Sequence, residues 1–129
     1  MSGAMVTPIV KDDTWQTPVP DAWRPTLAAI AEAFCEGDFE LARGIQDVSP
    51  VAPEDAQRIA ENIEDYGDEL ASLPHETWET SVCHWMDGYW HVLVDLYTVD
   101  EGASDLVLDV RVREHGAGFL FEVFFVYVP

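Results

Sequence analysis

Residues 83–92, CHWMDGYWHV, read almost the same in both directions about a central Asp-Gly, and they decide the fold of the second half of the chain. Asp-Gly between two alternating runs is the strongest short-range signal for a β-hairpin, because both central residues of a type I′ turn adopt positive φ. A turn at Asp87-Gly88 also fixes which residues face each other across the two strands. The facing pairs that it predicts are Trp85–Trp90, His84–His91 and Cys83–Val92.

The chain that follows residue 75 consists of β-branched and aromatic runs separated by short turn signals. The turn signals lie at Asp87-Gly88, at residues 100–102 and at His115-Gly116. The runs between them predict a four-stranded antiparallel meander. Its register predicts a continuous apolar face, made by the pairs Trp90–Val112, Val92–Val110, Val94–Leu108 and Leu96–Leu106 and completed by Phe119, Phe121, Val123 and Phe125.

Two helices are predicted ahead of the meander. Residues 21–36 carry apolar side chains at helical spacing, and Gly37 ends this stretch. Residues 53–73 carry a second apolar stripe, with Gly67 inside it and Pro74 at its end. The fold class is therefore α+β, with two N-terminal helices packed on a four-stranded antiparallel meander. Residues 1–20 are expected to be an extended, weakly ordered lead-in, and residues 21–129 a single domain.

The charge balance restricts the possible partners. The 129 residues include 25 acids and only six Lys and Arg, so the net charge is −19. Such a field repels nucleic acid and anionic membranes and attracts basic proteins. No apolar run is long enough for a membrane helix, and no secretory signal is recognised, which favours a cytoplasmic protein. Cys35 and Cys83 are expected to be buried free thiols.

The second face of the predicted sheet is polar and allows three interpretations. Two imidazoles and a carboxylate could hold a metal ion, but no third ligand lies close in the predicted register. His91 or Asp95 could instead transfer a proton, if a cleft encloses it. The third interpretation is a half-hydrated face whose charges pair across strands, which favours no metal and no cofactor. The cluster consists of His84, His91, Asp95, Asp109, Arg111 and Glu122.

The solvent side of the second predicted helix is crowded with acids. Like charges four residues apart weaken a helix, so the crowding suggests either a docking surface for a basic partner or adaptation to an acid-rich proteome. In the first case the opposite charges speed capture of the partner and orient it. The residues expected to bind it are Glu54, Glu61, Glu64, Asp65, Asp68 and Glu69.

No known catalytic template fits the chain. It has no Gly-x-Ser-x-Gly elbow, no glycine-rich phosphate loop, and no Cys-x-x-Cys or His-Glu-x-x-His motif. Cys83 and His84 are adjacent in a strand, so they point to opposite faces and cannot form a nucleophile pair. We therefore expect a protein that acts by binding and is not an enzyme.

Two resemblances extend this expectation. The segments DAWRPTLAAIAEAF, IEDYGDELASLP and TWETSVCHWMDGYWHVLVDLYTV resemble an uncharacterised family of small bacterial cytoplasmic proteins, and small acidic α+β proteins of this kind look like toxin-immunity proteins. This likeness implies an inhibitor that neutralises a basic toxin such as a nuclease. The order of helix, EGDF break, helix and strands is also similar to the ketosteroid-isomerase-like fold, which implies the alternative of a small-ligand or enzymatic pocket between helices and sheet.

Overall fold

A computed structural model describes residues 6–129, and it shows an α+β fold in which two α-helices accompany an antiparallel sheet. The helices are α1 (Arg24–Cys35) and α2 (Pro53–Tyr66), with two 3-10 helices, η1 (Asp21–Trp23) and η2 (His75–Glu79). The strands are β1 (Thr17–Pro18), β2 (Leu70–Ala71), β3 (Val82–Trp85), β4 (Trp90–Thr98), β5 (Gly102–His115) and β6 (Gly118–Tyr127).

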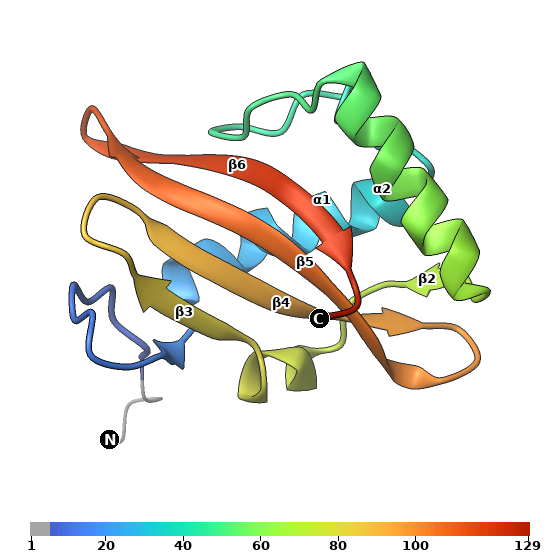
Figure 1. The fold of residues 1–129 in the computed structure, drawn as a ribbon. Helices are drawn as coiled ribbons and strands as arrows, with labels where there is room; N and C mark the ends of the chain where they lie inside the picture. Colours follow the sequence, from blue (N-terminus) through green and yellow to red (C-terminus); the bar gives the residue numbers. More distant parts are fainter. Residues whose placement is uncertain (1–5) are drawn as a thin grey trace.

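The sheet has six strands in the order β1-β3-β4-β5-β6, with β2 pairing with β4 (Figure 1). The predicted meander is present as β3 to β6, so it forms the larger part of a sheet that gains two short strands. Residues 77–79, at the start of the first predicted strand, belong to η2 instead. Thr77 in η2 donates its hydroxyl to the Asp95 carbonyl at 2.6 Å and so fixes this helix against β4.

The hairpin at Asp87-Gly88 has the predicted register. Asp87 has φ 58° and Gly88 has φ 141°, so both central residues adopt positive φ. The Met86 N–H closes the turn by donating to the Tyr89 carbonyl at 2.7 Å. The observed pairs include Trp85–Trp90, His84–His91, Cys83–Val92, Trp90–Val112, Val92–Val110 and Val94–Leu108.

Two irregularities change the predicted pairing further along the sheet. The register of β4 and β5 shifts between Asp95 and Tyr97, and the predicted Leu96–Leu106 pair is lost, although both side chains stay buried. Between β5 and β6, Val110 pairs with Val123 but Asp109 pairs with Phe125. The extra residue, Phe124, forms a bulge that reverses the alternation beyond it. The prediction that Phe125 lies on the core face is therefore wrong, and Val126 occupies that face, fully buried opposite Leu108.

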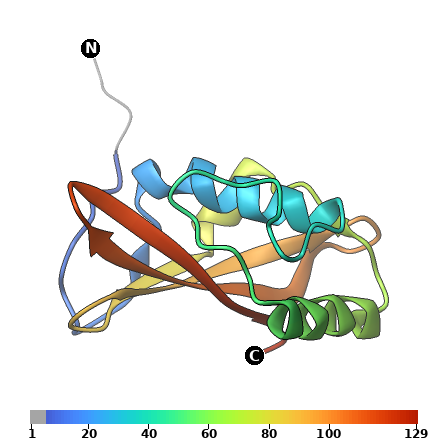
Figure 2. The same cartoon turned by 90° about the horizontal axis from the view of Figure 1, so that it is seen from above.

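The core lies between α1 and one face of the sheet. Figure 2 shows α1 running across this face, with α2 beside the end of β6 rather than over the middle of the sheet. Trp23, Leu27 and Ile30 are each at most 2% exposed. They pack on strand residues that are equally buried: Trp90, Val92, Val94, Leu108 and Val110. The opposite face of the sheet, which faces the viewer in Figure 1, is crossed by neither α-helix.

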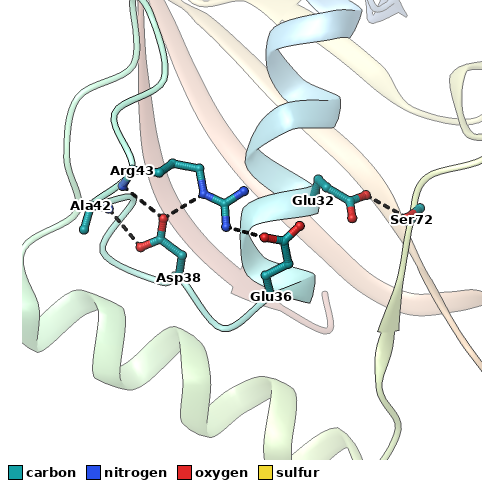
Figure 3. A network of polar contacts seen from close by, with 6 residues as sticks. All are labelled: Glu32, Glu36, Asp38, Ala42, Arg43 and Ser72. Atoms are coloured by element: carbon teal, nitrogen blue, oxygen red, sulfur yellow. Dashed lines mark hydrogen bonds and ion pairs between the residues drawn. The ribbon is translucent and has the colours of Figure 1, made fainter.

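A turn stabilised by Asp38 follows α1. Its carboxylate accepts the N–H groups of Ala42 at 2.8 Å and Arg43 at 3.2 Å, and the Arg43 guanidinium bridges it to Glu36 (Figure 3). The Ala42 N–H, with Arg43, lowers the pKa of Asp38. Glu32 on α1 also accepts a hydrogen bond from Ser72, which ties the helix to the segment after β2.

Helix α2 ends earlier than predicted. Gly67 has φ 88° and forms a left-handed cap after Tyr66, so it terminates the helix instead of lying within it. Asp68 and Glu69 therefore belong to the connection between α2 and β2. Of the predicted apolar stripe, Ala56, Ile59 and Ile63 are buried.

The two edge strands of the four-stranded meander, β3 and β6, are covered by other parts of the chain. Along β6, the Phe121 N–H donates to Asp47 at 2.8 Å and the Phe121 carbonyl accepts from Ser49 at 2.9 Å. The side-chain amide of Asn62 on α2 donates to the Val126 carbonyl at 2.9 Å. On the other side, β1 pairs with β3.

The lead-in segment makes specific contacts over the residues that the structure describes. The Trp90 indole N–H donates to the Val10 carbonyl at 2.8 Å, and a ring nitrogen of His84 lies 2.9 Å from the Asp13 carbonyl. Val19 is fully buried. Residues 1–5, part of the same predicted segment, lie outside the described residues. Within residues 6–129, neither α-helix combines the length and apolarity that crossing a membrane requires.

Candidate functional site

The open face of the sheet brings four of the predicted cluster residues into one row. His84 pairs with His91, His91 with Arg111, and Arg111 with Glu122, so the four residues cross β3, β4, β5 and β6 in register. Residues directly opposite in an antiparallel sheet share a face, and their side chains lie close together. The hairpin turn at Asp87-Gly88 sets this row, since it determines the first pair.

Within the cluster, the side chain of His91 contacts that of Asp109. Its Nε2 lies 2.9 Å from Oδ1 of Asp109, and the carboxylate is almost wholly buried. The two residues are diagonal neighbours, because Asp109 pairs directly with Leu93. This contact orients the imidazole and becomes an ion pair when the ring is protonated. Proton transfer would in addition require a ligand bound on this face.

The other two acids of the cluster, Glu122 and Asp95, lie in different surroundings. Glu122 forms an ion pair with Arg113 at 2.6 Å. Asp95 lies opposite Val107, and its backbone N–H donates to the Ser81 hydroxyl at 2.9 Å. In the described part of the chain, no three His, Cys, Asp or Glu side chains are placed to hold a metal ion together.

Arg111 is held by aromatic rings. Its guanidinium carbon lies 3.7 Å from the centroid of the Phe124 ring and 5.0 Å from that of Tyr89. Sequence reasoning placed Arg111 in the cluster but missed both rings. Tyr89 could have been found from the hairpin register, because it precedes Trp90 and so faces the open side. Phe124 could not, since its position depends on the bulge.

The second predicted site, the acidic surface around α2, is only partly helical. Glu54, Glu61, Glu64 and Asp65 lie on α2 and are exposed to solvent. Glu69 is also exposed, in the connection that follows the helix. Arg58, the single basic residue of α2, forms an ion pair with Asp55 at 2.6 Å. Its positive charge therefore does not neutralise the exposed carboxylates of this surface.

Asp68 has a structural role that the sequence did not indicate. Its carboxylate accepts the N–H groups of Glu69 at 2.8 Å and Asp100 at 3.1 Å, which joins the end of α2 to the turn between β4 and β5. The Thr98 hydroxyl, together with these N–H groups, lowers the pKa of Asp68. Asp68 therefore stabilises the connection after α2 through these hydrogen bonds, and it does not project from the helix.

These connections form an acidic hollow at the C-terminal end of α2. The hollow has a volume of about 600 Å³. Four of its lining residues are acids, and Val99, which is 62% exposed, adds an apolar wall. The negative end of the α2 dipole points towards the same place. The four acids are Glu64, Asp68, Glu69 and Asp100.

Comparison with known proteins assigns the chain a family but no activity. The model of a family described as a domain of unknown function (DUF7668) matches residues 31–129, which is more than half of the chain. Neither the curated proteins nor the solved structures contain a match.

Proposed function

The chain belongs to the DUF7668 family, and we propose that it is a binding protein that inhibits a basic protein through the acidic surface around α2. In this proposal it acts as a bacterial immunity protein does, by covering the surface of a basic toxin such as a nuclease in the cytoplasm. The observation that carries the proposal is the acidic hollow, with the unpaired carboxylates of α2 beside it.

The acidic hollow has the chemistry that a basic side chain requires. A lysine or arginine of the partner would enter among four acids, where the end of a helix adds partial negative charge. The exposed carboxylates along α2 would attract the partner before contact, because complementary charge raises association rates. Exposed Val99 at the rim provides apolar contact that helps exclude water from the ion pairs.

The core supports surface binding over the alternative, a ketosteroid-isomerase-like pocket. Such a pocket would lie between the helices and the sheet. Here the large side chains of α1 and of the sheet fill that layer, and Trp23, Leu27 and Trp90 are at most 2% exposed. A ligand there would have to displace packed core side chains, which is costly at the packing density of protein interiors.

Charge reversal with a matched control tests the proposal. Glu64 and Glu69 are exposed acids at the hollow, whereas Glu76 and Glu79 are exposed acids in η2, at a distance from α2. The variant Glu64→Lys/Glu69→Lys therefore has the same net charge as Glu76→Lys/Glu79→Lys. The measurement is affinity capture from extracts of the source bacterium, followed by association rates of the captured protein against salt.

We expect a basic protein to bind the wild type and the η2 variant and to be lost from the hollow variant. Its association rate should fall as salt rises, because screening weakens electrostatic steering. Equal capture by both variants, or capture of no basic protein, would contradict the proposal. If the wild type folds only in molar salt, the acids are an adaptation to a salty cell interior and not a docking surface.

A further inference from the structure

Three of the five arginines of this acidic chain line a single hollow near the start of α2, away from the acidic hollow at its other end. The hollow has a volume of about 480 Å³ and lies between α2 and the open face of the sheet at β5 and β6. Arg58 comes from α2, and Arg111 and Arg113 come from one face of β5. Its other walls include Asp55, Glu122, Phe124 and Phe125. We refer to it as the arginine hollow.

Arg111 differs from every other Lys and Arg side chain in the described residues. Arg58 pairs with Asp55 and Arg113 pairs with Glu122, both at 2.6 Å. Outside the hollow, Lys11, Arg24 and Arg43 also have carboxylate partners. Within residues 6–129, Arg111 has no carboxylate oxygen within 4.0 Å, even though the chain carries 25 acids. The arginine hollow is thus lined by three guanidinium groups and only two carboxylates.

The surroundings of Arg111 fix its position without neutralising its charge. Its guanidinium carbon lies 5.0 Å from the centroid of the Tyr89 ring and 3.7 Å from that of the Phe124 ring. Stacking on an aromatic ring holds the plane of a guanidinium while its edge remains able to donate hydrogen bonds. Its Nε is buried and has no hydrogen-bond partner in the described part of the chain. A buried donor without a partner is costly, so its presence calls for an explanation.

We propose that the arginine hollow binds a small organic carboxylate with an apolar body. The carboxylate would be held by Arg111, because a guanidinium edge matches the two oxygens of a carboxylate. Arg58 and Arg113 would add positive charge around it. Phe124, which is 53% exposed, would contact the apolar body of the ligand. The combination of a guanidinium edge and an exposed ring is what distinguishes this ligand class from a simple inorganic anion.

This inference is independent of the proposed inhibitor function. The arginine hollow involves Asp55 and Arg58, near the start of α2, whereas the acidic hollow lies beyond its end. At 1.5 Å per residue, the 14 residues of α2 span about 20 Å. The charges of the two hollows are also opposite, so one surface can fail its test while the other passes.

The test uses benzoate as the probe, with benzamide and inorganic phosphate as matched controls. Benzamide keeps the ring and loses the charge, and phosphate keeps the charge and loses the ring. Binding is followed by ¹H–¹⁵N NMR of the full chain, including the Arg111 Nε–H resonance. We expect saturable benzoate-induced shifts at Arg111, Glu122 and Phe124. Weaker binding of both controls is expected.

Two variants assign the effect to the hollow. Arg111→Gln should lower benzoate affinity by about tenfold or more, as expected when a charge-assisted hydrogen bond is lost. Arg43→Gln, outside the hollow, should leave it unchanged. If Arg111→Gln does not fold, Arg58→Gln decides instead, because the Arg58 side chain is 64% exposed and its loss should spare the fold.

Three results would overturn the proposal. The first is no saturable shift with benzoate at millimolar concentration. The second is phosphate binding as tightly as benzoate, which would assign the site to simple anions. The third is benzoate binding that survives Arg111→Gln, or survives Arg58→Gln where that variant decides.

Discussion

Trp23 contacts Trp90 edge to face, with ring centroids 5.2 Å apart and an interplanar angle of 73°. Trp23 comes from η1, immediately before α1, and Trp90 is the first residue of β4. Both rings are at most 2% exposed. The contact therefore joins the helical layer to the hairpin that sets the register of the sheet, and aromatic pairs in this geometry are favourable beyond the area that they bury.

Replacing Trp90 should severely destabilise the fold. Trp90→Ala removes a fully buried aromatic side chain and its contact with Trp23, and such a truncation costs about 3–5 kcal/mol of unfolding free energy. Trp15→Ala is the matched control, because Trp15 is 67% exposed and its loss should change stability by no more than about 0.5 kcal/mol. Urea unfolding of both variants measures the difference. Similar losses would show that burial of Trp90 does not govern stability.

Gly88 should not tolerate a side chain. A Cβ at Gly88 would meet nothing within 4 Å, so any destabilisation by Gly88→Val would come from its φ of +141° and not from a clash. Backbone strain of this kind costs about 1–3 kcal/mol. Gly118→Val is the control, since it also has free space but no positive φ. Thermal unfolding should show a clear loss for Gly88→Val, and a greater loss at Gly118 would contradict the role assigned to the turn.

Asp68 should make stability depend on pH in acid. Its pKa in the folded protein is lowered from 3.8, so the ionised carboxylate stabilises the fold at higher pH. This contribution is complete above about pH 4 and disappears as the pH falls through the lowered pKa. The difference in unfolding free energy between wild type and Asp68→Asn should therefore be largest near neutral pH and shrink below pH 4.

The control for Asp68 is Asp65→Asn, which removes an exposed acid from α2 itself. We expect its stability to follow that of the wild type across the same pH range. A difference for Asp68→Asn that stays constant from neutral to strongly acidic pH would contradict the assigned hydrogen bonds.

The two thiols should react slowly in the folded protein. Burial raises the pKa of Cys83 to about 12, and burial together with Glu32 and Glu36 raises the pKa of Cys35 to about 11. Because the thiolate is the reactive form, both cysteines should be alkylated slowly by iodoacetamide at pH 8 and rapidly after unfolding in urea. Mass spectrometry of timed samples measures both rates. Rapid alkylation of Cys83 in the native protein would contradict its burial.

The sheet was largely predictable because one turn controls it. Asp87-Gly88 requires a two-residue loop, and the alternating runs beside it then have a single register that buries their apolar side chains. The prediction was wrong at Phe125 because a bulge adds one residue, and nothing in an uninterrupted aromatic run shows where it falls. The helix end at Gly67 was missed because a glycine at helical spacing can continue a helix or cap it.

The candidate sites were less predictable, because they depend on contacts distant in sequence. The pairs His84–His91 and His91–Arg111 followed from strand register alone. The Arg111–Glu122 pair did not, because a turn centred on His115-Gly116 would have placed Glu122 opposite Asp109, whereas His115 pairs with Gly118. The arginine hollow did not, since it requires the bulge that exposes Phe124 and the position of α2 beside β6. The structural role of Asp68 depends on the turn at Asp100, which lies 32 residues away.

The coverage of β6 and β3 has a consequence for how this protein behaves at high concentration. A bare outer strand offers its backbone groups to any other extended chain, and fibrils and domain-swapped dimers grow by such additions. Here the segment around Asp47 and Ser49, together with Asn62, already occupies positions along β6, and Pro18, which has no N–H to donate, lies in β1 outside β3. A chain with so aromatic a sheet is thereby protected against self-assembly through its own strands.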